Sequence, residues 1–276
     1  MLRPLAAPAA AFCLFLSTSG LAAAADDAAA LQAALKLPEV FSVMSEEGLD
    51  YGRQLEADMF PGSGGRQWQE AVTGIYSTDR MLEDFGTAFE AELNRTDTGA
   101  MLDFFSSDLG QRVTTLEISA RRALLDDSVE DASRLKLEEM RAEADPRIDL
   151  IAEFVTANDL IEANVTGGLN ANYAFYLGLA DADALGREMS EDEVIAEVWG
   201  QEDDIREETD LWINSYLAMA YAPLTDAELH DYIAFSRTEA GKDLNRALFA
   251  GFDAVFNDVS RQLGRAAGAV LSGQDL

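Results

Sequence analysis

The sequence predicts an all-α fold. Apolar residues make up 48% of the chain, and they recur at spacings of three, four and seven, as on one face of an α-helix. No run of alternating β-branched residues indicates a strand. Two Ser/Thr-x-x-Glu sequences, which begin at Ser190 and Thr225, are typical of the capping box that opens a helix.

The first 25 residues are expected to form a secretory signal peptide. Arg3 supplies the positive charge, residues 5–16 are apolar, and Ala23-Ala24-Ala25 is a small-residue cleavage site. An uncleaved membrane anchor is the alternative, because the segment is just long enough to span a bilayer. Cys13 lacks the small preceding residue of a lipoprotein site. We therefore expect a periplasmic or secreted protein that begins at Asp26.

From Asp26 onward the pattern predicts a succession of helices. Pro38 suits the first turn of a helix, residues 61–65 form the clearest loop, and Gly167-Gly168 is expected to interrupt the chain. The longest predicted helix is heavily charged and has an optional break near Asp126. The predicted helices cover 26–35, 38–60, 68–75, 78–93, 100–106, 108–144, 146–155, 169–179, 190–199 and 202–221, followed by two helices that begin after Thr225 and Thr238.

Residues 224–242 predict a tight corner between two capped helices, and an earlier stretch of the chain repeats its pattern. The shared positions are leucine, aromatic and glycine residues, separated by one constant offset of 131 positions. They pair Leu93 with Leu224, Phe104 with Phe235, Gly110 with Gly241, Phe85 with Tyr216, Met81 with Trp212 and Trp68 with Trp199. Further upstream the offset is 120, where residues 48–50 match 168–170 and residues 40–41 match 160–161.

This repetition predicts an internal duplication, in which Phe104 superposes on Phe235 and Trp68 on Trp199. The expected organisation is a signal peptide (1–25), a first helical unit (26–126), connecting helices (127–156) and a second helical unit (157–276). The two units are expected to be related to each other and joined by the long charged helix.

The corner resembles part of a family of bacterial exported proteins that carry domain of unknown function 2059. The similar residues are Leu224 to Leu229, Phe235 and the pair Gly241-Lys242; the first copy keeps Phe104-Phe105 and Gly110-Gln111 but lacks the Thr-x-x-Glu cap. In the second copy, Ser236 stands where the family often has a second aromatic residue. The resemblance implies an all-helical exported domain, and it implies no catalytic residues.

The charge balance argues against two classes of partner. The chain has 20 basic and 51 acidic residues, a formal net charge of −31. Nucleic acid binding requires a basic surface, and anionic membranes repel acidic proteins. Cleavage after Ala25 would also remove Cys13, the one cysteine, which would exclude disulfides and thiolate catalysis.

No catalytic residue is predicted. His230 is the one histidine, and its place on the helix after Thr225 points it away from the apolar face, toward solvent. No nucleophile, zinc-protease, phosphate-loop or dinucleotide motif is present. Paired carboxylates are numerous, but sequence alone does not show whether any pair is buried. The three tryptophans (Trp68, Trp199 and Trp212) could line an apolar pocket, although core packing is the default for such residues.

The one candidate metal site is a calcium loop with Asp181, Asp183 and Asp192 as ligands. These residues occupy positions one, three and twelve of a loop of the EF-hand type, with Gly186 at position six. Leu185 and Glu188 do not fit the pattern. The alternative is an acidic loop between two helices, capped by Ser190.

These observations favour a non-catalytic exported binding or scaffold protein of the cell envelope. Its expected partner is an envelope protein or an apolar ligand held between helices; no cofactor, no nucleic acid and, after cleavage, no membrane span are expected. The alternative is a carboxylate-based hydrolase that acts on an envelope polymer. A buried acid pair in a cleft would favour the hydrolase, whereas an apolar groove would favour binding.

Overall fold

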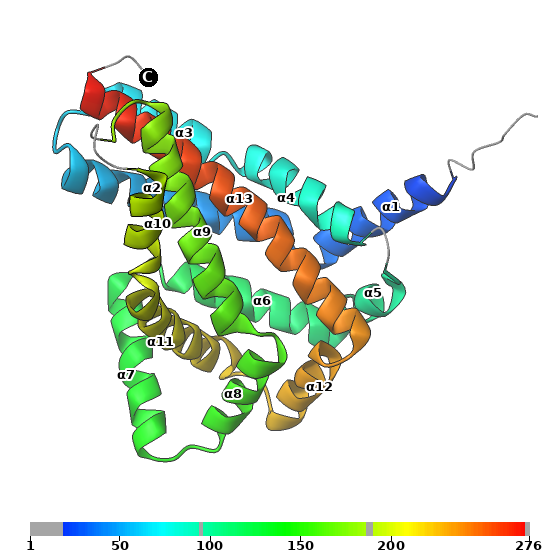
Figure 1. Cartoon of the computed structure of the whole chain (residues 1–276). Helices are drawn as coiled ribbons and strands as arrows, with labels where there is room; N and C mark the ends of the chain where they lie inside the picture. The colour runs from blue at the N-terminus through cyan, green and yellow to red at the C-terminus, as the bar shows by residue number, and fades with distance from the viewer. Residues whose placement is uncertain (1–18, 94–95, 186–189, 274–276) are drawn as a thin grey trace, which may run out of the picture.

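The computed structural model describes residues 19–93, 96–185 and 190–273, with side chains from Asp27 onward. Within these residues the chain is helical and contains no strand (Figure 1), which confirms the all-α prediction. The helices are α1 (Ser19–Ala34), α2 (Leu37–Met59), α3 (Gly65–Ile75), α4 (Thr78–Leu93), α5 (Gly99–Phe105), α6 (Asp108–Ala123), α7 (Asp127–Ala142), α8 (Arg147–Ala157), α9 (Leu160–Asp181), α10 (Glu191–Trp199), α11 (Glu202–Tyr221), α12 (Asp226–Ser236) and α13 (Glu239–Ser272).

The segment predicted as a signal peptide falls largely outside the described residues, which begin at Ser19. Its cleavage therefore stays a prediction. In the part of the chain that the structure covers, no helix is both long enough and apolar enough to cross a bilayer.

Local capping signals set several helix starts as predicted. Ser190 opens α10 and Thr225 opens α12, each with a complete capping box in which the glutamate three residues later bonds back to the cap. Pro38 lies in the first turn of α2. In such a cap the side chains satisfy backbone N–H groups that have no partner inside the helix.

Two predictions about helix continuity can be compared with the structure. The optional break near Asp126 in the helix expected over 108–144 is present: the segment forms two helices, α6 and α7, because Asp126 accepts a hydrogen bond from the Ser128 amide at 2.9 Å and caps a new helix start. The expected interruption at Gly167-Gly168 does not occur, since α9 continues through both glycines. Each glycine costs a helix about 1 kcal/mol, and the packing of α9 against α11 and α13 outweighs that cost.

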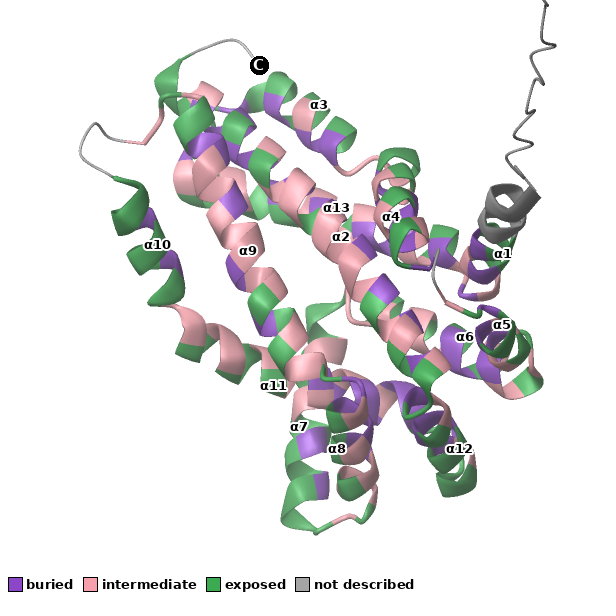
Figure 2. Ribbon diagram, turned by 45° about the vertical axis from the view of Figure 1, so that its right-hand side comes forward, coloured by how far each residue is buried: buried purple, intermediate pink, exposed green. Residues whose placement is uncertain are grey.

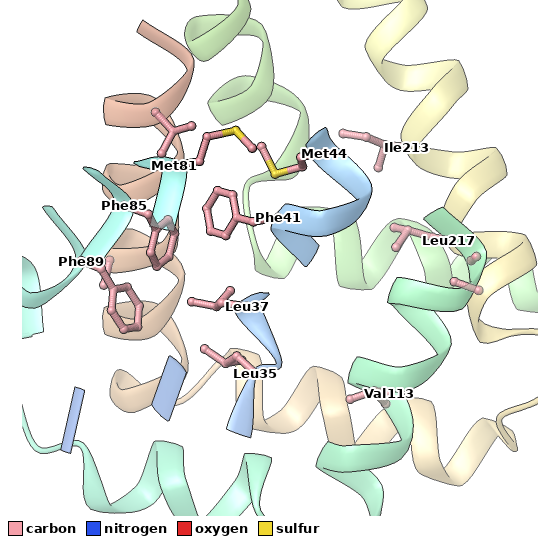
Figure 3. Packing of buried hydrophobic residues seen from close by; sticks show 14 of the residues in the cluster. Leu35, Leu37, Phe41, Met44, Met81, Phe85, Phe89, Val113, Ile213 and Leu217 are labelled. Carbon is pink, nitrogen blue, oxygen red and sulfur yellow. The ribbon is translucent and has the colours of Figure 1, made fainter. Parts of the chain in front are cut away.

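The core is one continuous cluster of buried side chains that extends from α1 to α13. The longest helix, α13, lies along both α9 and α4 (Figure 1). The Phe41 ring on α2 lies 5.4 Å from the Phe85 ring on α4 and 5.7 Å from the Phe252 ring on α13, between centroids. Figure 3 shows Phe41 and Phe85 next to each other, with Leu35 and Leu37 extending the same layer.

A smaller cluster of buried side chains holds α10 against α9. Along α3 and α10, single buried residues are separated by exposed or partly exposed ones (Figure 2).

The two corners predicted from the repeat, α5–α6 and α12–α13, have the same local hydrogen bonds. In the first, the Ser107 hydroxyl donates to the Phe104 carbonyl at 2.6 Å. In the second, the Thr238 hydroxyl donates to the Phe235 carbonyl at 2.7 Å. Each hydroxyl also accepts a bond from the amide three residues later and so caps the following helix.

Glycine is required at the matching position of each corner. A Cβ atom on Gly110 would lie 2.1 Å from the Phe104 carbonyl oxygen, and one on Gly241 would lie 2.2 Å from that of Phe235. The two corners meet in space, because the Phe104 and Phe235 rings stack with centroids 4.1 Å apart and planes 9° apart. Both rings are only partly buried and pack against the core cluster, so they join the two corners at the edge of the core.

The equivalence does not extend to every predicted pair. Trp68 is 1% exposed and donates from its indole nitrogen to the Gly52 carbonyl at 2.9 Å, whereas Trp199 is 43% exposed at the end of α10. The α1–α2 and α8–α9 junctions do share a left-handed residue, Lys36 and Asp159 respectively. Duplication of the whole units, and the division of the chain between them, stay predictions.

Candidate ligand-binding site

A partly enclosed cavity of about 190 Å³ lies where the two corners meet the centre of the molecule. Its walls come from both predicted units: α2, α5 and α6 on one side, and α11, α12 and α13 on the other. Most of the lining is apolar or aromatic, and the polar groups gather on α6. The lining residues are Leu35, Leu37, Val40, Val43, Phe105, Thr114, Glu117, Ile118, Arg121, Tyr216, Tyr232, Leu248 and Phe252.

Glu117 of α6 is the carboxylate of this lining, and three tyrosines from α11 and α12 converge on it. The Tyr221 hydroxyl donates to Glu117 Oε1 at 2.6 Å, and the Tyr232 hydroxyl donates to the same oxygen at 3.3 Å. The Tyr216 hydroxyl donates to the Glu117 backbone carbonyl at 3.1 Å. Glu117 therefore connects α6 to both α11 and α12.

The second carboxylate oxygen of Glu117 has no hydrogen-bond partner among the described residues. Both hydrogen bonds to the carboxylate end on Oε1, and no described residue donates to Oε2. Among the described residues, no fully buried side-chain oxygen lacks a hydrogen-bond partner. Oε2 is therefore not fully buried, and the open space that Glu117 lines is the cavity. An occupant could bond to this oxygen without displacing either tyrosine.

Arg121, one turn after Glu117, is already paired. Its Nε and Nη2 donate to the two oxygens of Glu47 on α2 at 2.8 and 2.7 Å. This two-bond geometry is the strongest form of an Arg–carboxylate pair. Burial disfavours the charged guanidinium, but the hydrogen bonds and charge of Glu47 outweigh burial and raise the pKa of Arg121. Arg121 is thus committed to Glu47.

Burial raises the pKa of Glu117 to about 7, against an ordinary value of 4.5, although the hydrogen bonds from Tyr221 and Tyr232 oppose the rise. The pKa values of these two phenols are raised as well, by burial and then by the charge of Glu117. At neutral pH the cavity therefore contains a carboxyl group poised between its two charge states.

The sequence analysis does not single out Glu117, because the pattern places it on the long charged helix that is expected to join the two units. A signal is nevertheless present. Val113, Thr114 and Ala120 are buried on α6, and Glu117 falls among them at helical spacing, three or four residues from each. A single carboxylate within an apolar stripe indicates a buried acid.

The predicted calcium ligands are placed as follows. Asp181 ends α9, and its two oxygens accept bonds from Arg261 at 2.9 and 3.3 Å and from Arg265 at 2.7 Å. Asp183 is exposed, and Asp192 lies in the first turn of α10. Residues 186–189 of the loop lie outside the described residues. In the described part, no three Asp, Glu, His or Cys side chains form a metal-binding group, so the calcium loop stays a prediction.

None of the remaining candidates lines the cavity. His230 is exposed on α12, as the sequence predicted. The three tryptophans do not share a pocket: Trp68 belongs to the core, and Trp199 is at the surface. Trp212 stacks on Tyr216 at 5.1 Å and lines an open surface hollow.

Comparison with known proteins supports the predicted resemblance. Residues 79–135 match the model of a family described as an uncharacterized protein conserved in bacteria, domain of unknown function 2059. The matched segment contains the first corner and Glu117. Most of the residues that suggested the resemblance lie at the second corner. No curated protein and no solved structure matches the chain.

Proposed function

We propose that this chain is a non-catalytic exported binding protein of the cell envelope, and that it takes a small, largely apolar ligand into the Glu117 cavity. The observation that carries the proposal is the cavity itself, with apolar and aromatic walls and one carboxylate at its polar end. Binding sites for small molecules characteristically combine apolar walls with a few polar groups that orient the ligand.

Export is part of the proposal, and the packing near the predicted cleavage site is compatible with it. Asp27, the second residue of the predicted mature chain, accepts a hydrogen bond from the Thr98 hydroxyl at 3.1 Å. Ala28 and Leu31 are 1% and 0% exposed. Cleavage before Asp26 would therefore leave these described contacts of the core in place.

The hydrolase alternative requires two carboxylates that face one substrate. Glu117 is the one carboxylate among the described residues that line the cavity. Glu47 is close in sequence to the cavity residue Val43, but both of its oxygens are bonded to Arg121. This arrangement favours ligand binding over two-carboxylate hydrolysis.

A cavity-filling substitution tests the proposal. Small molecules extracted from cell envelopes are expected to raise the midpoint of thermal unfolding of the wild-type protein, because a ligand at 100 times its Kd adds about 2.7 kcal/mol to stability. Val40→Phe fills the cavity from α2 and should abolish that response. Leu135→Phe, at a site that is 61% exposed on α7, is the control and should respond like the wild type.

Two results would count against binding. Equal stabilisation of the wild type and Val40→Phe would place the ligand elsewhere. Release of cleavage products from an envelope polymer, lost in Glu117→Gln, would favour the hydrolase.

A further inference from the structure

The chemical character of the cavity narrows the class of ligand. Four aromatic side chains contribute to its walls: Phe105, Tyr216, Tyr232 and Phe252. The faces of such rings carry partial negative charge and attract cations. The wall therefore combines apolar surface with a preference for positive charge.

The charged groups at the polar end of the cavity also favour a positively charged ligand. Glu117, Glu47 and Arg121 together carry a formal charge of −1 when all three are ionised, and Arg121 is paired with Glu47. The Oε2 atom of Glu117 has no partner among the described residues, so it can accept a hydrogen bond from an occupant. No lysine or histidine lines the cavity in the described part of the chain. The one cation in the lining, Arg121, is already paired with Glu47, so an anionic ligand would meet the unbalanced charge of Glu117, whereas an ammonium group would balance it.

The volume limits the apolar body of the ligand. A cavity of about 150 Å³ is large enough to hold benzene, so one of about 190 Å³ has space for a benzene-sized body with a short arm. The protein as a whole is strongly acidic, with a net charge of −31, and such a field attracts cations and repels anions.

We infer that the Glu117 cavity binds a compact apolar amine, about the size of benzylamine, whose ammonium group donates to Glu117 Oε2 while the aromatic walls enclose its body. This inference rests on the proposed function and specifies its ligand class. The titratable groups that line the cavity are Glu117 and Arg121 of α6, Tyr216 of α11 and Tyr232 of α12.

Three probes of nearly equal shape test the inference by isothermal titration calorimetry at pH 8: benzylamine, benzyl alcohol and benzoate. The expected result is that benzylamine binds the wild-type protein at least tenfold more tightly than benzyl alcohol, and that benzoate does not bind. Glu117→Gln is expected to remove the preference for the amine while it retains weak binding of the alcohol, because the amide keeps the shape of the cavity. Val40→Phe should bind none of the probes.

The possible failures are distinct. Equal affinity for benzylamine and benzyl alcohol, unchanged in Glu117→Gln, would overturn the amine assignment while the cavity remained a binding site. Tighter binding of benzoate would also overturn it. Binding of benzylamine that survives Val40→Phe would place the amine on the acidic surface and not in the cavity. If no probe binds but envelope extracts stabilise the wild type and not Val40→Phe, the amine class is wrong and the binding function stands. If neither the probes nor the envelope extracts bind the wild-type protein, the amine assignment and the proposed binding function are both wrong.

Discussion

Gly178→Ala is expected to destabilise the protein by about 3 kcal/mol or more, the upper end of the range for overpacked cores. Gly178 of α9 faces α13 at a point where the two helix backbones touch. A Cβ atom there would lie 2.1 Å from the Arg261 carbonyl oxygen and 2.9 Å from the Gly264 Cα atom. The obstacle is the backbone of another helix, so α9 and α13 would have to separate along their shared length.

Gly168→Ala, in the same helix, is the matched control. The nearest atom to a Cβ at Gly168 is Ile205 Cγ2 at 3.6 Å, which is an ordinary contact. Alanine also favours a helix over glycine by roughly 0.5–1 kcal/mol, so this variant should equal or exceed the wild type in stability. Urea denaturation followed by far-UV circular dichroism measures both variants. Similar stabilities for the two would show that α9 and α13 do not cross as closely as described.

Between pH 4 and pH 8, the stability of Glu117→Gln relative to the wild type is expected to rise by about 3 kcal/mol. The pKa of Glu117 in the folded protein is raised from 4.5 to about 7, so the folded state holds this proton more tightly than the unfolded chain. Its contribution to stability is fully present below pH 4.5 and is lost as the pH rises to about 7. Each pKa unit corresponds to about 1.36 kcal/mol. The unfolding free energy of Glu117→Gln should therefore rise relative to that of the wild type between pH 4.5 and about 7, and the difference should persist at pH 8.

The quantity to measure is the difference in unfolding free energy between Glu117→Gln and the wild type at several pH values between 4 and 8. Taking the difference removes the contribution of the other acidic residues. Glu138→Gln, at an exposed position of α7, provides the control, and its difference from the wild type should stay nearly flat. A flat difference for Glu117→Gln as well would mean that its carboxyl is hydrated in the folded protein.

The features that the sequence predicted well depend on neighbouring residues. The capping boxes at Ser190 and Thr225 formed because the groups that satisfy each other are three residues apart. The Ser107 and Thr238 corners are local for the same reason, and their shared geometry was visible as a repeated phenylalanine and glycine spacing. The exposed position of His230 followed from the helical period alone.

The features that were missed depend on residues far apart in the chain. The continuity of α9 through Gly167-Gly168 comes from packing against α11 and α13, which no local propensity reveals. The Glu117 site joins α6 to tyrosines about a hundred positions later, at 221 and 232. The sequence predicts only that Glu117 lies on a long charged helix between the units, although Val113 and Ala120 are apolar and lie on the same face of that helix.

The central claim is that the Glu117 carboxyl forms the polar end of an accessible ligand cavity, and carbon-13 NMR of that carboxyl carbon tests it most directly. The resonance should titrate with a midpoint near pH 7 in the free protein. Saturating benzylamine should move the midpoint downward, because a nearby cation favours the ionised form, and the same addition to Val40→Phe should have no effect. A midpoint near the ordinary value of 4.5, with no response to benzylamine or benzyl alcohol, would contradict the claim.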